Sequence, residues 1–226
     1  MAVITPESFS KRSFIYRQFE GASFSEVDKS AIALSVNEDN DQQAKQLGLL
    51  DLSVLSRVGV RGKNAEQHMK TIGLPIPTLP NTSVTCPNGD MVLRLGQNSF
   101  WVLANIASHS DVIDAFEQTP LPGTDCYSLY CQNSHVWFAM TGNKLAETMA
   151  KVCGIDLRTE VFPVGSIVQT SVGKVSAIIV HHKLGDVPVF SILSESTVAD
   201  YLWVLLLDAM MEFGGRAVGL KDLIAS

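Results

Sequence analysis

The sequence predicts an α+β fold made of two related units, each an antiparallel sheet with helices on one face. Short β-rich stretches follow one another closely and are separated by turn residues, which is typical of antiparallel strands. A segment that reads strand, glycine, helix occurs at Gly62 and again at Gly142, 80 residues later. This recurrence indicates an internal duplication, although strand–turn–helix units are common enough to recur by chance. We expect an N-terminal arm at 1–49, a first repeat at 50–125 and a second repeat at 126–226.

Residues 1–49 are expected to form an extended arm with a strand at 30–35, because aromatic residues are scattered through a polar sequence. The strongly polar stretch 37–41 is expected to be a loop. Scattered aromatic side chains can pack on the protein's own core or dock on a partner, and the pattern allows either. The candidates for a partner contact in this arm are Phe14, Tyr16, Phe19 and Phe24.

The first repeat is expected to begin with a strand at 54–60, followed by a helix that starts at Asn64 as its N-cap and closes at Gly73. Met69 lies on the apolar face of this helix, and the sequence therefore predicts that it is buried. The further expected elements are strands at 91–95 and 99–104, which form a hairpin, and a helix at 109–118 with Val112, Ala115 and Phe116 facing inward.

The second repeat is expected to open with a hairpin whose strands lie at 127–131 and 135–141. A helix then carries Met149 at the position that matches Met69. The remaining expected elements are strands at 166–171, 174–181 and 187–193 and a helix at 198–213. Within this helix the segment 201–207 is apolar on every side, so it must be buried all round or covered by a partner. Its candidates for a partner contact are Tyr201 and Trp203.

Composition and charge exclude several classes of protein. Hydrophobic residues make up 46% of the 226 residues, which is enough for a packed core. The formal net charge is −6 and the 17 Lys and Arg residues are spread thinly, which argues against nucleic-acid binding and against a polybasic membrane anchor. The first residues lack the pattern of a signal peptide, and the longest apolar stretch is far shorter than a membrane span. We therefore expect a cytoplasmic protein.

The four cysteines are scattered through the sequence without a C-x-x-C motif. They are Cys86, Cys126, Cys131 and Cys153. In a chain of this size the pattern predicts reduced core residues, and the alternatives are a structural disulfide or a zinc site.

No pattern in the sequence is typical of a catalytic or metal site. Gly62-Lys63 lacks the spacing of a phosphate-binding loop, and no G-x-G-x-x-G follows a strand. His181 and His182 are adjacent on an expected strand, so their rings point to opposite faces and cannot chelate one metal ion together. The other histidines are His68, expected at the surface of a helix, His109, expected near a helix start, and His135, expected in a hairpin. We predict no catalytic residue and no metal ligand in this chain.

Two charged residues are nevertheless candidates for binding a small molecule. Asp90 directly precedes the strand at 91–95, where a carboxylate can hold an amine, although an aspartate there more often serves the turn. Arg94, like Arg57 and Arg61, can pair with a carboxylate through two hydrogen bonds, or it is a solvated strand residue.

Several segments resemble the glycine cleavage T-protein (aminomethyltransferase) superfamily. DLS at 51–53 with RVGVRG at 57–62 resembles its opening, and LRLGQNSFWVLAN at 93–105 resembles its second signature. The second half resembles the gamma subunits of heterotetrameric sarcosine oxidases. The segments that carry this second resemblance are MTGNKLAETMAKVCGIDL from Met140, EVFPVGSIVQTSVGKVSAIIVHH from Glu160 and GDVPVFSILSESTVADYLWVLLLDAM from Gly185.

The chain departs from the folate-using members of this superfamily in three ways. Their catalytic aspartate lies shortly before the strand that matches 91–95, whereas Asp90 falls about one position off that register, which on a strand turns a side chain to the other face. Their G-Y-T-G-E-D-G loop is reduced to KLGD at 183–186. The chain is also too short for their final barrel domain. Such losses are expected of a subunit that kept the scaffold and lost the site.

The resemblance implies a non-catalytic gamma subunit of a complex that demethylates sarcosine oxidatively to glycine, with tetrahydrofolate as one-carbon acceptor. It implies alpha, beta and delta subunits as partners, with FAD, FMN, NAD and tetrahydrofolate held by the complex and no cofactor bound by this chain alone. The alternative is a stand-alone folate-dependent one-carbon transferase or folate-binding regulator, in which Asp90 and Arg94 would contact folate or substrate. A scaffold for a related amine or dimethylglycine dehydrogenase is a third possibility.

Overall fold

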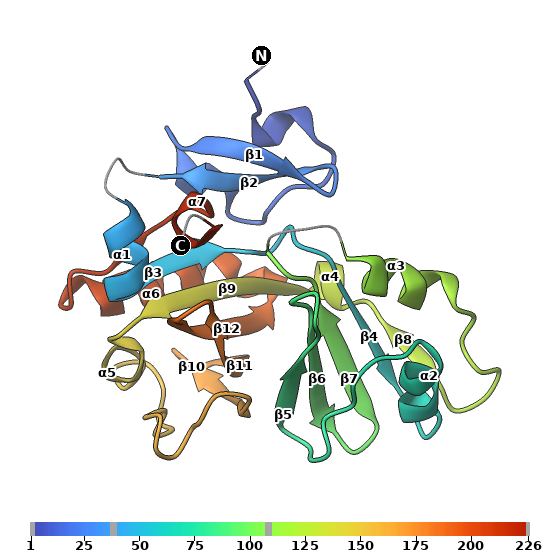
Figure 1. Cartoon of the computed structure of the whole chain (residues 1–226). Helices are drawn as coiled ribbons and strands as arrows, with labels where there is room; N and C mark the ends of the chain where they lie inside the picture. Colours follow the sequence, from blue (N-terminus) through green and yellow to red (C-terminus); the bar gives the residue numbers. More distant parts are fainter. Residues whose placement is uncertain (1–2, 37–39, 107–109, 225–226) are drawn as a thin grey trace. The chain divides into compact units, whose positions relative to one another are not determined.

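The computed structural model describes residues 3–36, 40–106 and 110–224, and these form two compact units (Figure 1). Unit 1 comprises Met1–Val54, His135–Val164 and Val168–Ser226, and unit 2 comprises Leu55–Ser134 and Gly165–Ile167. Each unit contains a sheet of largely antiparallel strands together with helices, so the predicted α+β class is confirmed. No closed barrel forms within the described residues.

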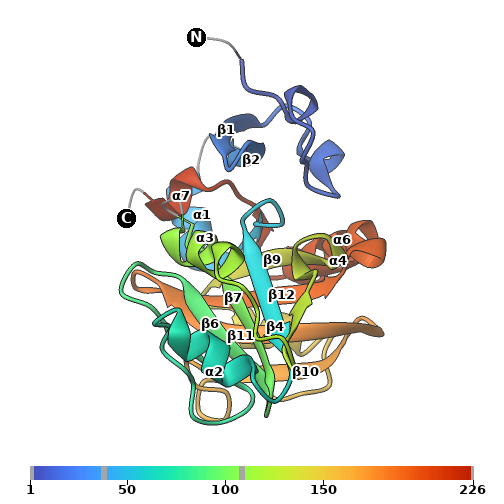
Figure 2. The ribbon, with the colours of Figure 1, turned by 90° about the vertical axis from the view of Figure 1, so that its right-hand side faces the viewer.

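Unit 2 is built on a five-stranded sheet in the order β5-β6-β7-β4-β8. Its strands are β4 (Arg57–Arg61), β5 (Thr82–Thr85), β6 (Met91–Gly96), β7 (Ser99–Leu103) and β8 (Tyr127–Leu129). Two helices, α2 (Ala65–Thr71) and α3 (Asp111–Gln118), lie over one face of this sheet, and Figure 2 looks onto that face. Apolar side chains from both helices and from the facing side of the strands form its core.

Unit 1 is built on a six-stranded sheet in the order β10-β11-β12-β9-β3-β13. Its strands are β3 (Gly48–Asp51), β9 (His135–Gly142), β10 (Ile167–Val172), β11 (Val175–Leu184), β12 (Val187–Glu195) and β13 (Arg216–Ala217). It also contains the helices α1 (Asn40–Leu47), α5 (Leu145–Met149), α6 (Ala199–Met211) and α7 (Lys221–Ile224). Residues of α5 and α6 share one core with the sheet.

The duplication expected from the sequence is present in the strand order. In unit 2 the strands β5, β6 and β7 form a meander beside β4, and in unit 1 the strands β10, β11 and β12 form a meander beside β9. Gly62 and Gly142 both have positive φ, +129° and +107°. A Cβ atom at these glycines would lie 2.1 Å from Asp125 O and 2.3 Å from Gln46 O, so both turns exclude a side chain. Met69 and Met149 are both fully buried.

The predicted hairpin of 127–131 with 135–141 is wrong. Strand β8 pairs with β4, whereas β9 pairs with β12 and β3, so the two strands belong to different sheets. A one-turn helix, α4 (Cys131–Ser134), separates them. The turn residues between the strands predicted a hairpin, but they end one sheet and begin the next.

The N-terminal region is more regular than expected. Its predicted strand is confirmed as β2 (Ser30–Ser35), which pairs with β1 (Ser23–Val27), and two short 3₁₀ helices precede this pair. Helix α1 and strand β3 were not expected, and β3 joins the sheet of unit 1 between β9 and β13. Of the predicted polar loop, residues 37–39 lie outside the described residues.

The helix predicted at 109–118 corresponds to α3, which begins at Asp111. Ser110 is its N-cap and accepts a hydrogen bond from the backbone N–H of Ile113. His109 lies outside the described residues. The buried side chains of α3 are Ile113 and Phe116, whereas Val112 and Ala115 are half-buried, so the inward face is turned slightly from the predicted one.

Candidate functional site

Asp90 is fully buried, and its carboxylate is surrounded by donors from within unit 2. It accepts hydrogen bonds from Asn88 Nδ2 at 2.8 Å and from Ser110 Oγ at 2.5 Å. It also accepts from the backbone N–H of Asn105 at 2.8 Å and from Asn105 Nδ2 at 3.1 Å. These four bonds join the turn before β6 to the segment after β7 and to the N-cap of α3. The hydrogen-bond acceptors of the carboxylate are therefore satisfied by groups of the protein itself.

Arg94 is also almost entirely enclosed, and it lies on β6, four residues after Asp90. Its guanidinium donates to the carbonyl oxygens of Pro77 and Gln97 at 2.9 and 3.0 Å. It forms an ion pair with Glu66 at 3.1 Å and lies 5.2 Å from the centre of the Phe100 ring. The side chain therefore ties the proline-rich connection and α2 to the sheet.

Two other residues are more buried than the sequence indicated. Arg57 is buried and donates to the backbone oxygens of Leu55, Cys131 and Gln132, rather than pointing into solvent. His68 was expected at the surface, but it is buried against Phe116 with ring centres 5.3 Å apart. Burial lowers the pKa of His68.

The aromatic residues named as partner contacts fall into two groups. Phe19 and Trp203 are buried in the core of unit 1, with their rings 5.2 Å apart, and Trp203 also contacts Phe138. A partner could reach these two side chains only after the core had opened. Phe24 is half-buried against the same core, and Tyr16 is half-buried beside two arginine side chains. The exposed members of the set are Phe14 and Tyr201.

Helix α6 has one buried and one exposed apolar face. Leu202, Trp203 and Leu206 are buried in unit 1, which accounts for most of the all-round apolar segment. Tyr201, Val204 and Met211 remain 49%, 56% and 69% exposed, respectively. We call these three residues the α6 stripe. Their spacing places them on one side of the helix.

The two adjacent histidines point to opposite faces of strand β11, as expected from the strand period. His182 is fully buried beside Ser191, and its Nε2 lies 2.8 Å from Ser191 Oγ. Trp137 Nε1 donates to the same oxygen at 2.8 Å, so Ser191 Oγ links the Trp137 and His182 side chains. Burial lowers the pKa of His182 to about 4, which keeps this ring neutral near pH 7.

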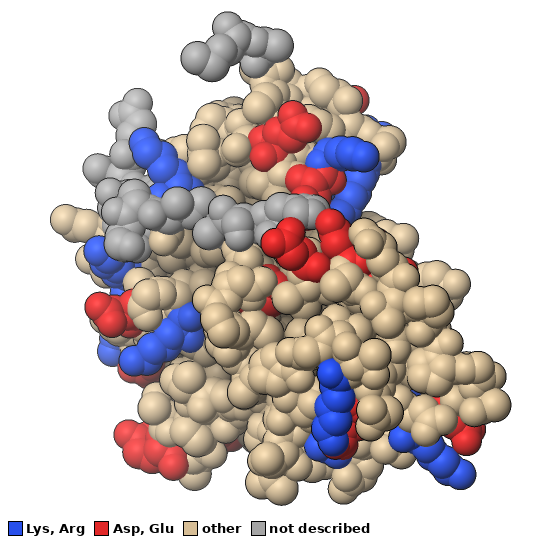
Figure 3. Space-filling view, turned by 45° about the vertical axis from the view of Figure 1, so that its right-hand side comes forward, with Lys and Arg blue, Asp and Glu red and all other residues tan. Residues whose placement is uncertain are grey.

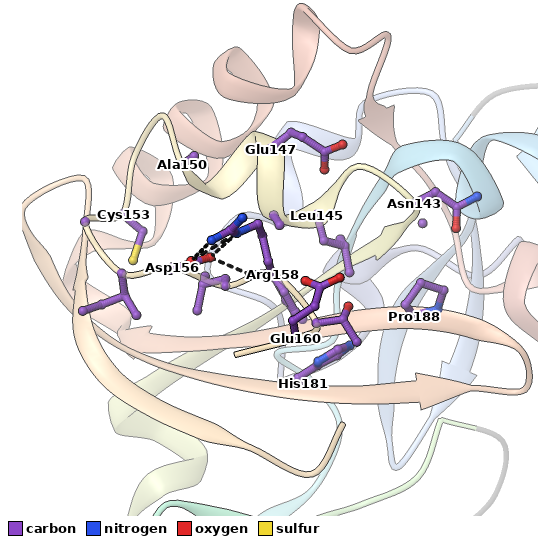
Figure 4. A pocket seen from close by; sticks show the side chains of 17 residues that line it. Asn143, Leu145, Glu147, Ala150, Cys153, Asp156, Arg158, Glu160, His181 and Pro188 are labelled. Atoms are coloured by element: carbon purple, nitrogen blue, oxygen red, sulfur yellow. Dashed lines mark hydrogen bonds and ion pairs between the residues drawn. The ribbon is translucent and has the colours of Figure 1, made fainter. Parts of the chain in front are cut away.

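A hollow of about 850 Å³ opens in unit 1 between α5, the segment that follows it, and strands β11 and β12 (Figure 4). Its apolar wall is formed by Leu145 and Ala146 of α5, by Ala150 at the C-cap of this helix, and by Pro188 and Phe190 of β12. Its polar lining is formed by Asn143, Glu147, Asp156, Arg158, Thr159, Glu160 and His181.

Sequence reasoning missed this hollow because its walls come from distant parts of the chain. The local signal was the charged segment 156–160, which nothing in the sequence connects to His181. A strand residue and a loop residue about twenty positions earlier come together only when the sheet and α5 pack.

Neither the cysteines nor the charge distribution adds another site. All four cysteines are free and buried, as predicted, and burial raises the pKa of Cys86 and of Cys131 to about 11. Within the described ranges no group of three or more His, Cys, Asp or Glu residues could hold a metal ion. Basic side chains are scattered among acidic ones on the face that Figure 3 shows. None of the described helices is long and apolar enough to cross a membrane.

Comparison with known proteins identifies the family. Residues 4–223 match the family model of the GCVT N-terminal domain. The chain belongs to this family. The match extends over both units, and it agrees with the superfamily that the sequence segments indicated. A search of proteins with curated functions found no match.

Two solved structures with similar folds come from different enzymes. A chain of the heterotetrameric sarcosine oxidase from Corynebacterium sp. U-96 has a TM-score of 0.63 and 20% identity, over 75% of this chain and 86% of that chain. The glycine cleavage system aminomethyltransferase T from Bartonella henselae has a TM-score of 0.71 and 17% identity, over 94% of this chain. The match spans 60% of that aminomethyltransferase. At these identities the likeness is one of fold.

Proposed function

We propose that this chain is the non-catalytic gamma subunit of a cytoplasmic, heterotetrameric sarcosine oxidase. The observation that carries the proposal is the likeness to a chain of such an enzyme. Because 75% of this chain covers 86% of that chain, the matched chain is shorter than this one and is itself a small subunit. The complex would oxidise sarcosine to glycine, and FAD, FMN, NAD and tetrahydrofolate would be held by the complex rather than by this chain alone.

The internal contacts of Asp90 and Arg94 support a structural role for this chain. In an enzyme that used these residues for folate or substrate, at least part of each side chain would face a ligand. Here the Asp90 carboxylate accepts four hydrogen bonds from its own unit, and the Arg94 guanidinium is held by backbone oxygens and Glu66. Releasing either group would leave buried donors unpaired, which is costly. We infer that both residues stabilise unit 2.

The α6 stripe supports association with a partner. Three large apolar side chains on one side of a helix favour a contact that removes them from water. Asp200 and Asp208 are exposed on the same helix. The complementary surface would therefore be apolar with basic residues around it.

Co-expression with the alpha, beta and delta subunits of a heterotetrameric sarcosine oxidase from the same genome tests the proposal. We expect the affinity-tagged chain to copurify with flavin-containing subunits and with sarcosine-dependent formation of hydrogen peroxide. Val204→Lys should weaken copurification at least about tenfold, because a charge would be buried in the contact. Leu79→Lys, at a similarly exposed apolar residue of unit 2, is the matched control. A tagged chain that never retains a flavoprotein would refute the proposed function.

A stand-alone folate-binding or one-carbon transfer protein is the second candidate. The observation that favours it is the fold match to an aminomethyltransferase over 94% of this chain. It predicts saturable binding of tetrahydrofolate by the isolated chain, which Asp90→Ala or Arg94→Ala would abolish without unfolding the protein. Isothermal titration, with circular dichroism on each variant, measures both. Binding that is absent, or that is lost only together with the fold, would contradict this alternative.

A further inference from the structure

His181 brings a hydrogen-bond acceptor to the hollow beneath α5. The side chain is 3% exposed, and it is enclosed by Phe162, which stacks on it with centres 5.8 Å apart, and by Phe190 at 5.0 Å. Its Nδ1 lies 2.6 Å from the carbonyl oxygen of Phe162. A carbonyl oxygen only accepts, so Nδ1 carries a proton, and Nε2 is the acceptor of this tautomer.

The Nε2 atom of His181 is open to the hollow. Throughout the described part of the chain, no hydrogen bond reaches this atom. In the described part of the chain, the side-chain atoms that are both fully buried and without a hydrogen-bond partner are His68 Nε2, Arg94 Nε and Thr148 Oγ1. His181 Nε2 is not among them, so it is not fully buried. Since His181 lines the hollow, its free acceptor is accessible from that side. A nearly buried ring that is held by two aromatic neighbours keeps this acceptor in a fixed direction.

The charges around the hollow favour a cation. Its lining contains three acidic residues and one arginine, and the Arg158 guanidinium is already bound to Asp156 at 2.5 Å (Figure 4). Glu147 pairs with Lys144 at 3.0 Å. Glu160 acts on Arg158 through charge but forms no hydrogen bond or ion pair with any described residue. Glu160 and His181 both line the hollow (Figure 4).

We propose that this hollow binds a small organic ammonium compound. Its N–H groups would donate to His181 Nε2 and to the Glu160 carboxylate, and its alkyl or aromatic part would rest on Leu145, Pro188 and Phe190. Both unpaired groups accept hydrogen bonds, whereas Arg158, the one cationic side chain of the lining, is already paired with Asp156. The apolar wall adds affinity for a carbon skeleton beside the charge. This site does not depend on the proposed role as a gamma subunit.

Titration of the full-length chain with propylammonium chloride tests the site. The readout is the nuclear magnetic resonance signal of the His181 ring, assigned by comparison with His181→Phe. We expect a saturable shift of this signal with a dissociation constant of roughly millimolar size, which is typical of so small a ligand. Sodium propionate at the same concentration should leave the signal unmoved. Tetramethylammonium, which lacks an N–H donor, should bind at least about fivefold more weakly.

Two variants separate binding from folding. Glu160→Gln, at an exposed position, should weaken propylammonium binding about tenfold. Glu26→Gln, an exposed glutamate on β1, is the matched control and should leave binding unchanged. If His181→Phe fails to fold, the titration of the natural chain and of Glu160→Gln still decides. Equal shifts with propylammonium and propionate, or no saturable shift of His181, would overturn the proposal.

Discussion

Single residues in this protein serve roles that their sequence neighbours do not reveal. Asp90 follows a proline–asparagine–glycine turn, which suggests a solvated turn residue. The structure instead buries its carboxylate among donors from three separate segments. A buried carboxylate is stable only when such donors surround it. The backbone of Asp90 therefore belongs to a turn, as the sequence indicated. Its side chain also connects three segments of unit 2, which the sequence did not indicate.

Asp90→Asn should lower the free energy of unfolding by about 2–3 kcal/mol. The amide NH2 group of asparagine would face the N–H and O–H groups that now donate to the Asp90 carboxylate. Urea unfolding followed by circular dichroism measures this loss. Asp186→Asn, in the exposed turn between β11 and β12, should change stability by less than about 0.5 kcal/mol. An unchanged unfolding midpoint in Asp90→Asn would show that these hydrogen bonds contribute little.

His182 should make the protein less stable in acid. Burial lowers its pKa from 6.5 to about 4 in the folded chain, so between these values the unfolded chain binds more protons than the folded one. Stability therefore falls as the pH drops from about 6.5 to 4, by about 3 kcal/mol in total. His182→Gln cannot titrate, and its unfolding free energy should depend less steeply on pH across this range. Parallel slopes for the two proteins would contradict the assignment.

At the scale of elements, the strand–glycine–helix turn is the unit that recurs. Gly62 and Gly142 occupy equivalent places at the ends of β4 and β9, and at each a neighbouring backbone carbonyl fills the space of a side chain. Each glycine permits the positive φ of the turn. It also allows the turn to lie against the backbone of another segment, because no side chain stands between them. This explains why the sequence pattern repeats most clearly at these two positions.

Gly142→Ala should destabilise the chain by more than about 3 kcal/mol, since a Cβ atom would meet Gln46 O at 2.3 Å and the backbone has positive φ. Gly154→Ala is the control, because no atom lies within 4 Å of its would-be Cβ. It should stay within about 0.5 kcal/mol of the natural chain. Thermal unfolding of both variants measures the difference, and equal midpoints would refute the steric argument.

At the scale of the whole molecule, each unit has its own core, and the exposed α6 stripe belongs to unit 1. If the stripe is a subunit contact, partners bind the folded chain and stabilise it by mass action. The thermal midpoint of the chain should then rise by several degrees when a molar excess of the partner subunits is added. Val204→Lys should remove most of this increase while leaving the midpoint of the isolated chain within about 2 °C. If the thermal midpoint does not change when the partner subunits are added, the α6 stripe is not a subunit contact.

The sequence by itself determined the local elements and their repetition. Apolar periodicity and turn residues were sufficient for β6 and β7, for β10, β11 and β12, for α2, α5 and α6, and for the match of Gly62 with Gly142, because these signals depend on neighbouring residues. Strand β5 was not predicted. Only the tertiary structure decided which strands pair, that Phe19 and Trp203 belong to the core, and that His181 and Glu160 share a hollow. These facts depend on contacts between residues far apart in the chain. The packing of the whole sheet determines such contacts, and the spacing of apolar residues within one element does not predict them.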